Sequence, residues 1–227
     1  MKNSRENIIM CIFAAALLFV GTLKAEAQKA EFGFRFMPTF SSFEMKTFSG
    51  GTVKGKVTLG FGAGAFLGFN FTDNVGIQGE VIYNSISQKY KELDVEQKVN
   101  LRYVNIPLLL SLNTGKSKQV NGNLVAGLQI GISAGNSITT SGSIEGINNA
   151  QAILSVKKGD LGFAYGGGVD FGINPMGTFR LGVGFRGVYG LVDISDNNTS
   201  TTTDAYYILD KTHIKTYSGY VGFSLLF

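Results

Sequence analysis

In the segment TLGFGAGAFLGFN, residues 58–70, glycines alternate with apolar side chains. One face carries Phe61, Ala63, Ala65, Leu67 and Phe69, and the other carries Gly60, Gly62, Gly64 and Gly68. A period of two predicts a β-strand with one apolar face and one nearly bare face. A phosphate-binding glycine loop would instead need G-x-G-x-x-G spacing between a strand and a helix. Here the glycines keep the period of two, and a turn at Thr72–Asn74 follows.

The same alternation recurs in seven further segments along the chain. They are Phe32–Phe36, Val75–Asn84, Tyr103–Leu112, Asn121–Ile132, Leu161–Phe171, Phe179–Leu191 and Tyr217–Phe227. The segment Tyr103–Leu112 is the least regular, because Leu109 falls on its polar face. Pro107 in the same segment lacks a backbone N–H, so it demands either a bulge or a missing hydrogen bond.

The connections between these segments alternate in length. Short turns are expected at 72–74, 113–119 and 174–177, and long polar loops at 41–56, 85–100, 134–159 and 195–211. An even number of antiparallel strands, with short turns at one end and long loops at the other, is typical of outer-membrane barrels. The chain is therefore expected to be all-β: an eight-stranded antiparallel up-and-down transmembrane β-barrel with both termini on the periplasmic side.

The apolar face is expected to point to lipid, because the other face holds mostly glycine and isolated charges and would make a poor water-facing surface. A soluble ligand-binding barrel, with the faces exchanged, is the alternative. Aromatic residues near the segment ends fit the girdles found at both membrane interfaces. These are Phe69, Phe71, Phe171, Phe179 and Phe227 toward the short turns, and Tyr83 and Tyr189 toward the long loops.

The inward face is expected to hold a structural network of charges. Its predicted members are Arg35, Glu80, Asp170, Arg180 and Arg186. Eight strands enclose a space just wide enough for side chains. The inward glycines are therefore interpreted as steric relief for these long side chains, with a ligand crevice opening toward the long loops as the alternative.

Two hairpins allow the pairing of strands to be predicted, because register must bring apolar positions together. The hairpin that turns after Phe71 is expected to place Phe66 opposite Glu80. The hairpin centred on Pro175 is expected to place Asp170 directly opposite Arg180.

The N-terminus predicts export. Lys2 and Arg5 precede an apolar run of 13 residues, Ile8–Val20, and Ala25–Ala27 reads as a cleavage site. Residues 1–27 are thus expected to be a cleaved signal peptide, and residues 28–227 the barrel. The remaining chain has no cysteine, hence no disulfide framework. Its formal net charge of +3, without a basic cluster, argues against nucleic-acid binding.

Three motifs, YVNIPLLL, DLGFAYGGGVDF and FRGVYGLVDI, precede an aromatic C-terminus. In this order and spacing they resemble the PorT-type outer-membrane barrel family of Bacteroidetes-group bacteria, over nearly all of Ala30–Phe227. The resemblance implies an eight-stranded barrel that is often labelled porin-like. The namesake of the family serves protein secretion by the type IX route, and the family has no catalytic motif to carry over.

Catalysis is not expected. The single histidine, His213, stands near Asp210 and Ser195 in the sequence, but a Ser-His-Asp arrangement needs hydrogen-bond geometry that spacing alone does not supply. No metal or cofactor motif is present. The expected function is a non-enzymatic structural or partner-binding role through the long loops. A secretion component and a small-solute transporter are the alternatives. The expected partners are outer-membrane lipid, an envelope or secretion protein, and the barrel-assembly machinery, through the aromatic C-terminal strand.

Overall fold

The computed structural model describes residues 29–42, 44–47, 52–54, 56–92, 95–141, 158–192, 207–208 and 214–227. The predicted signal peptide lies outside these ranges, as do Ser195, Asp210 and His213. No helix in the described part of the chain is long and apolar enough to cross a membrane.

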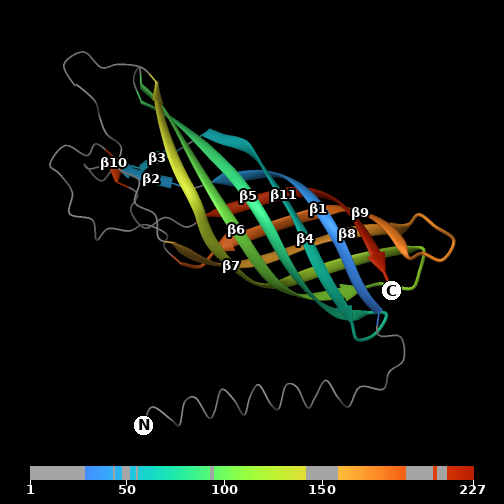
Figure 1. Cartoon of the computed structure of the whole chain (residues 1–227). Helices are drawn as coiled ribbons and strands as arrows, with labels where there is room; N and C mark the ends of the chain where they lie inside the picture. Colours follow the sequence, from blue (N-terminus) through green and yellow to red (C-terminus); the bar gives the residue numbers. More distant parts are fainter. Residues whose placement is uncertain are drawn as a thin grey trace, which may run out of the picture.

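Eight long strands close into one antiparallel barrel, with each strand beside its sequence neighbour among the eight and β1 completing the circle against β4 and β11 (Figure 1). The strands are β1 (Lys29–Ser42), β4 (Lys56–Asn70), β5 (Val75–Glu92), β6 (Val95–Asn113), β7 (Val120–Ser141), β8 (Gly159–Gly172), β9 (Phe179–Gly190) and β11 (Lys215–Leu226). Three short strands, β2 (Glu44–Thr47), β3 (Thr52–Lys54) and β10 (Tyr207–Ile208), form a separate small sheet. The predicted fold class is confirmed.

The outer face of the barrel is apolar, as the alternation predicts. Large hydrophobic side chains such as Phe34, Leu67 and Leu108 are 58%, 64% and 65% exposed, whereas Glu80 on the inward face is 2% exposed. This arrangement inverts that of a soluble barrel and suits a surface that meets hydrocarbon. Closing the sheet also pairs the backbone groups that lipid could not satisfy.

Each predicted long loop contains strand residues: β2 and β3 lie within 41–56, and β10 lies within 195–211. Within 85–100, residues 85–92 continue β5 and residues 95–100 continue β6, and the two strands stay paired as far as Glu92 opposite Val95. In this part the alternation reverses its polarity. Ile86 and Leu101 point inward and are buried, whereas Ser87 on the outward face is polar. Polar outward positions suit a strand that has left the bilayer, and they made the stretch resemble a loop. The strand β7 likewise runs on through 134–141, which was also expected to be loop.

The predicted pairing of β4 with β5 is confirmed, with Phe66 opposite Glu80. Pro107 causes a missing bond rather than a bulge. Glu80 and Val81 of β5 have no ladder partner on β6. The pairs on either side, Gly79 with Leu108 and Ile82 with Asn105, keep the same register, so no residue is inserted. Leu109 does point inward, where it is 1% exposed.

The predicted pairing of β8 with β9 is wrong by two residues. Arg180 lies opposite Gly172, and Asp170 lies opposite Gly182, so the hairpin is centred on Met176. The turn explains the shift. Asn174 accepts backbone hydrogen bonds from Gly177 and, through its side chain, from Phe179, and Gly177 takes a positive φ of 66°. Because the shift is an even number, every side chain keeps its predicted face.

Candidate functional site

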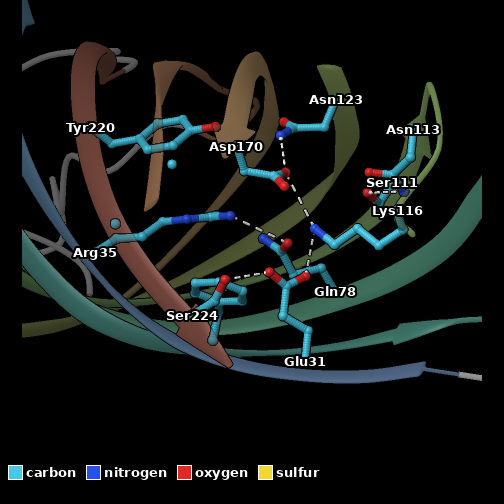
Figure 2. A pocket seen from close by; sticks show the side chains of 13 residues that line it. Glu31, Arg35, Gln78, Ser111, Asn113, Lys116, Asn123, Asp170, Tyr220 and Ser224 are labelled. Carbon is cyan, nitrogen blue, oxygen red and sulfur yellow. Dashed lines mark hydrogen bonds and ion pairs between the residues drawn. The ribbon is translucent and has the colours of Figure 1, made fainter. Parts of the chain in front are cut away.

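Inward residues of all eight long strands and of one turn meet in the barrel half near the short turns (Figure 2). Asp170 on β8 is the centre of the first cluster. Its carboxylate accepts a hydrogen bond from the Arg180 side chain of β9, and it lies 3.3 Å from the Lys116 ammonium. Asn121 and Asn123 of β7 also donate to it, at 2.9 and 3.2 Å. Four donors thus surround one buried carboxylate.

Lys116 joins this cluster to β1. It belongs to the turn between β6 and β7, yet its side chain is only 7% exposed, because it points into the barrel (Figure 2). Its ammonium nitrogen lies 2.8 Å from Glu31, whose carboxylate also accepts a hydrogen bond of 2.7 Å from Ser224 on β11. A charged residue of a short turn is usually solvated, so the alternation along the chain holds no signal for Lys116.

A second cluster lies around Glu80 on β5. Arg186 of β9 donates two hydrogen bonds to its carboxylate, at 2.9 and 3.3 Å, and Arg35 of β1 and Gln78 donate to it as well. The Arg35 guanidinium also lies over the Phe66 ring, 4.1 Å from its centroid. The arginine fork and the ring together restrict Arg35, because both contacts depend on the orientation of the guanidinium plane.

The five residues of the predicted charge network therefore all lie inside the barrel, but they form two groups. Arg35, Glu80 and Arg186 meet in one group, and Asp170 and Arg180 in the other. Sequence reasoning missed the polar residues that complete the groups: Glu31, Gln78, Lys116, Asn121 and Asn123. Of these, Gln78, Asn121 and Asn123 follow the inward alternation and were recognisable by it.

The turn between β6 and β7 is hydrogen-bonded to the short turns on either side of it, and the three turns close this end of the barrel like a floor. Lys116 donates its backbone N–H to Asp73 O at 2.9 Å, and Gln119 donates its side-chain amide to Gly172 O at 2.7 Å. Arg180 donates to Lys118 O at 2.9 Å and to Gly177 O at 3.0 Å. The turn between β6 and β7 is thus tied to both of its neighbours.

Apolar side chains fill other parts of the interior. Leu109, Val125 and Ala164 pack together, with Val188 against them, and Met37, Ile82 and Tyr220 form a second cluster. Inward glycines make room for the rings. A Cβ atom at Gly184 would lie 2.6 Å from the Tyr220 ring, and one at Gly33 would lie 2.6 Å from the Phe66 ring. Both contacts favour the steric-relief interpretation of the glycines.

The space left between the charged groups is small. A cavity of about 20 Å³ is lined by Arg35, Gln78, Lys116 and Asp170, among others (Figure 2). This volume is close to what one water molecule needs. Within the described residues, no group of three His, Cys, Asp or Glu side chains is arranged to hold a metal ion. The site's chemistry is thus that of a buried network of ion pairs, in which the Nε of Arg186 has no hydrogen-bond partner.

Comparison with solved structures supports the fold. OprG, an outer-membrane protein of Pseudomonas aeruginosa, is 16% identical, with a TM-score of 0.55 over 89% of this chain and 97% of that chain. AlkL, an outer-membrane protein solved in lipid bilayers, is 13% identical, with a TM-score of 0.49 over 89% and 91% of the two chains. Neisserial surface protein A is 16% identical, with a TM-score of 0.42 over 85% and 96%. At these identities the likeness shows the fold alone, and of these three structures OprG is the one with a TM-score above 0.5.

Comparison with curated proteins finds no match. A family model described as outer membrane protein beta-barrel domain matches residues 26–196, which is most of the chain and includes β1 through β9. The family match and the apolar exterior both indicate a barrel that lies in the outer membrane. The chain belongs to the outer membrane protein beta-barrel domain family, and its location is the outer membrane.

Proposed function

We propose that this protein is a non-enzymatic outer-membrane barrel that binds an envelope or secretion partner through its long-loop end. The observation that carries the proposal is the difference between the two ends. The short-turn end is closed by the hydrogen-bonded floor and by buried ion pairs. At the other end, β7 is 22 residues long, whereas β9 and β11 have 12 each, so one wall extends well beyond the other (Figure 1).

The extended wall is suited to binding. It consists of the outer halves of β5, β6 and β7, which remain paired with one another to Glu92, Val95 and Ser141. A paired sheet is a more rigid base for recognition than a loop, because its backbone hydrogen bonds are already formed. This property supports partner binding, and the PorT-type resemblance supports a secretion protein as one class of partner.

Small-solute transport is the weaker candidate. A path through the lumen would have to pass the ion pairs of Glu80 and Asp170 and the packed cluster of Leu109, Val125 and Ala164. A cavity of about 20 Å³ does not hold a solute of several atoms.

Two further proposals concern biogenesis. Residues 1–27 are a cleaved signal peptide, and N-terminal sequencing of the mature protein, expected to begin at Gln28, tests this. The barrel-assembly machinery recognises the C-terminal strand β11 and the residue that follows it, where Phe223 and Phe227 are both exposed. Replacing both by serine is expected to lower the amount of barrel in the outer membrane more than the same change at Phe32 and Phe34.

The binding proposal is tested by crosslinking in intact cells, followed by recovery of the tagged barrel in detergent. The matched variant replaces residues 88–99 by Asn-Gly, which closes the hairpin between Ser87 and Asn100, an opposed pair. The shortened barrel is expected to keep its heat-modifiable migration on gels and to lose the crosslinked partner. Recovery of the same partner by both proteins would contradict the proposal.

A further inference from the structure

The outward side chains of β5, β6 and β7 change from apolar to polar and basic along the length of these strands. Opposed outward residues form cross-strand rows, and the rows nearer the short turns are apolar. Examples are Ile106 opposite Ile130, at 40% and 54% exposure, and Leu108 opposite Leu128, at 65% and 55%. The last row of this kind contains Tyr83, which lies opposite Val104. An exposed tyrosine at the end of an apolar band marks the level of the lipid headgroups.

The three rows beyond Tyr83 contain three basic side chains. Lys89 lies opposite Lys98, and Arg102 lies opposite Ser85, two rows closer to the membrane band. The other outward positions of these rows on the three strands carry Ser87, Asn100, Gly135, Ser137 and Thr139. We call these nine positions the cationic platform. None of them holds an acidic residue.

The positive φ of Gly135 helps to build the platform. The pairing of β6 with β7 shifts by one residue between Tyr103 and Arg102, and Gly135, with φ of 132°, lies at this shift. Such a bulge re-aims the side chains that follow it. Without the shift, Ser137 and Thr139 would face the barrel interior, and the platform would lose two of its hydroxyl groups.

Lys98 and Arg102 are two exposed cations on the same face of β6, and both attract an anion that lies against this face. Arginine adds a planar fork that matches phosphate oxygens. The surrounding hydroxyl and amide groups are suitable hydrogen-bond partners for a sugar. Asn100 already donates to Ser137 at 3.5 Å, which keeps the two side chains together on the surface.

The position of the cationic platform relative to the membrane indicates which ligand it binds. Its first row is adjacent to the Tyr83 row, and the long-loop end of an outer-membrane barrel faces the cell exterior. We propose that the cationic platform binds the phosphate-bearing headgroup of an anionic glycolipid in the outer leaflet. The acyl chains of this lipid lie along the apolar rows below, so the headgroup and the chains are recognised by one continuous surface.

The test uses the complete mature barrel in nanodiscs of phosphatidylcholine with a small fraction of bisphosphorylated lipid A. Native mass spectrometry after extraction counts the lipid A molecules retained, and titration gives their affinity. The double substitution Lys98→Gln/Arg102→Gln is expected to weaken lipid A binding by about thirtyfold, from the loss of two cations at an anionic surface. The charge-preserving variant Lys98→Arg is expected to bind normally.

Lys118→Gln is the matched control, because it removes one exposed lysine at the short-turn end, away from the platform. It is expected to leave binding unchanged. Lipid A without its phosphates is expected to bind as weakly as the double variant does. Equal binding by the double variant and the unmodified barrel would overturn the proposal. So would equal retention of dephosphorylated lipid A, or full displacement of lipid A by inorganic phosphate at millimolar concentration.

Discussion

Lys116, on the turn between β6 and β7, places its ammonium nitrogen 2.8 Å from a carboxylate oxygen of Glu31 on β1. The same nitrogen lies 3.3 Å from Asp170 on β8. One turn residue therefore connects two strands on different sides of the barrel. Both carboxylates are more than nine-tenths buried, so this lysine neutralises charge where water cannot.

Replacing Lys116 by methionine is expected to destabilise the barrel by about 3–5 kcal/mol, because two buried carboxylates lose a cation. The free energy of unfolding in urea, measured with the barrel in detergent or lipid, checks this. Lys118→Met, two residues further along the same turn, changes an exposed side chain and is expected to stay within about 0.5 kcal/mol. Equal losses for the two variants would contradict the buried contacts of Lys116.

Asp170 and Arg180 remain an ion pair although they are not opposed in the sheet. Asp170→Asn and Arg180→Gln are each expected to cost roughly 3–5 kcal/mol of unfolding free energy, since each leaves a buried charge without its partner. The double variant is expected to cost less than the sum, and the difference measures the coupling. Strictly additive losses would show that the two side chains do not interact.

Val183 lies on the lipid-facing side of β9, is 42% exposed, and pairs with Val169 and Val221. Val183→Arg is expected to cost about 2–4 kcal/mol if this position is near the bilayer midplane. Thr139→Arg serves as the depth control, because Thr139 lies on the cationic platform beyond the apolar band. A cost of about 0–1 kcal/mol is expected there. Equal costs would place both positions at the same depth.

The purified monomer is expected to show no porin-sized conductance in a planar bilayer. Aqueous channels need about 16–18 strands, and this barrel has eight long ones. The ion pairs of Arg186 with Glu80 and of Arg180 with Asp170 occupy the lumen. Stable openings of porin size that disappear when Gly184 is replaced by a bulky residue would overturn this prediction and favour transport.

The alternation of side chains was sufficient to predict the eight long strands, the inward face of the five charges in the predicted network and the β4–β5 register. It was insufficient for the β8–β9 register, because pairings that differ by two residues place the same side chains on the same faces. The choice between them depends on how Asn174 and Gly177 shape the turn. Local turn geometry of this kind leaves no trace in the periodicity.

Two other features escaped prediction for different physical reasons. Lys116 is buried by the tertiary fold of its turn, and nothing in a polar turn distinguishes an inward lysine from a solvated one. The outer halves of β5 and β6 were taken for a loop because their polarity reverses once they leave the bilayer. Ile86 and Leu101 alternate with Ser85, Ser87 and Arg102 as they would in a soluble sheet.

The contact between Arg186 and Glu80 also bears on how the barrel forms. These residues are 106 positions apart, on strands that do not adjoin each other, so their ion pair can exist only once the sheet has curled into a cylinder. An open sheet would expose both charges on a surface destined for the interior and would gain nothing from them. The ion pair therefore contributes its stabilisation only when the barrel closes, and partly curled intermediates lack this stabilisation. The barrel should accordingly unfold in a single cooperative transition rather than strand by strand.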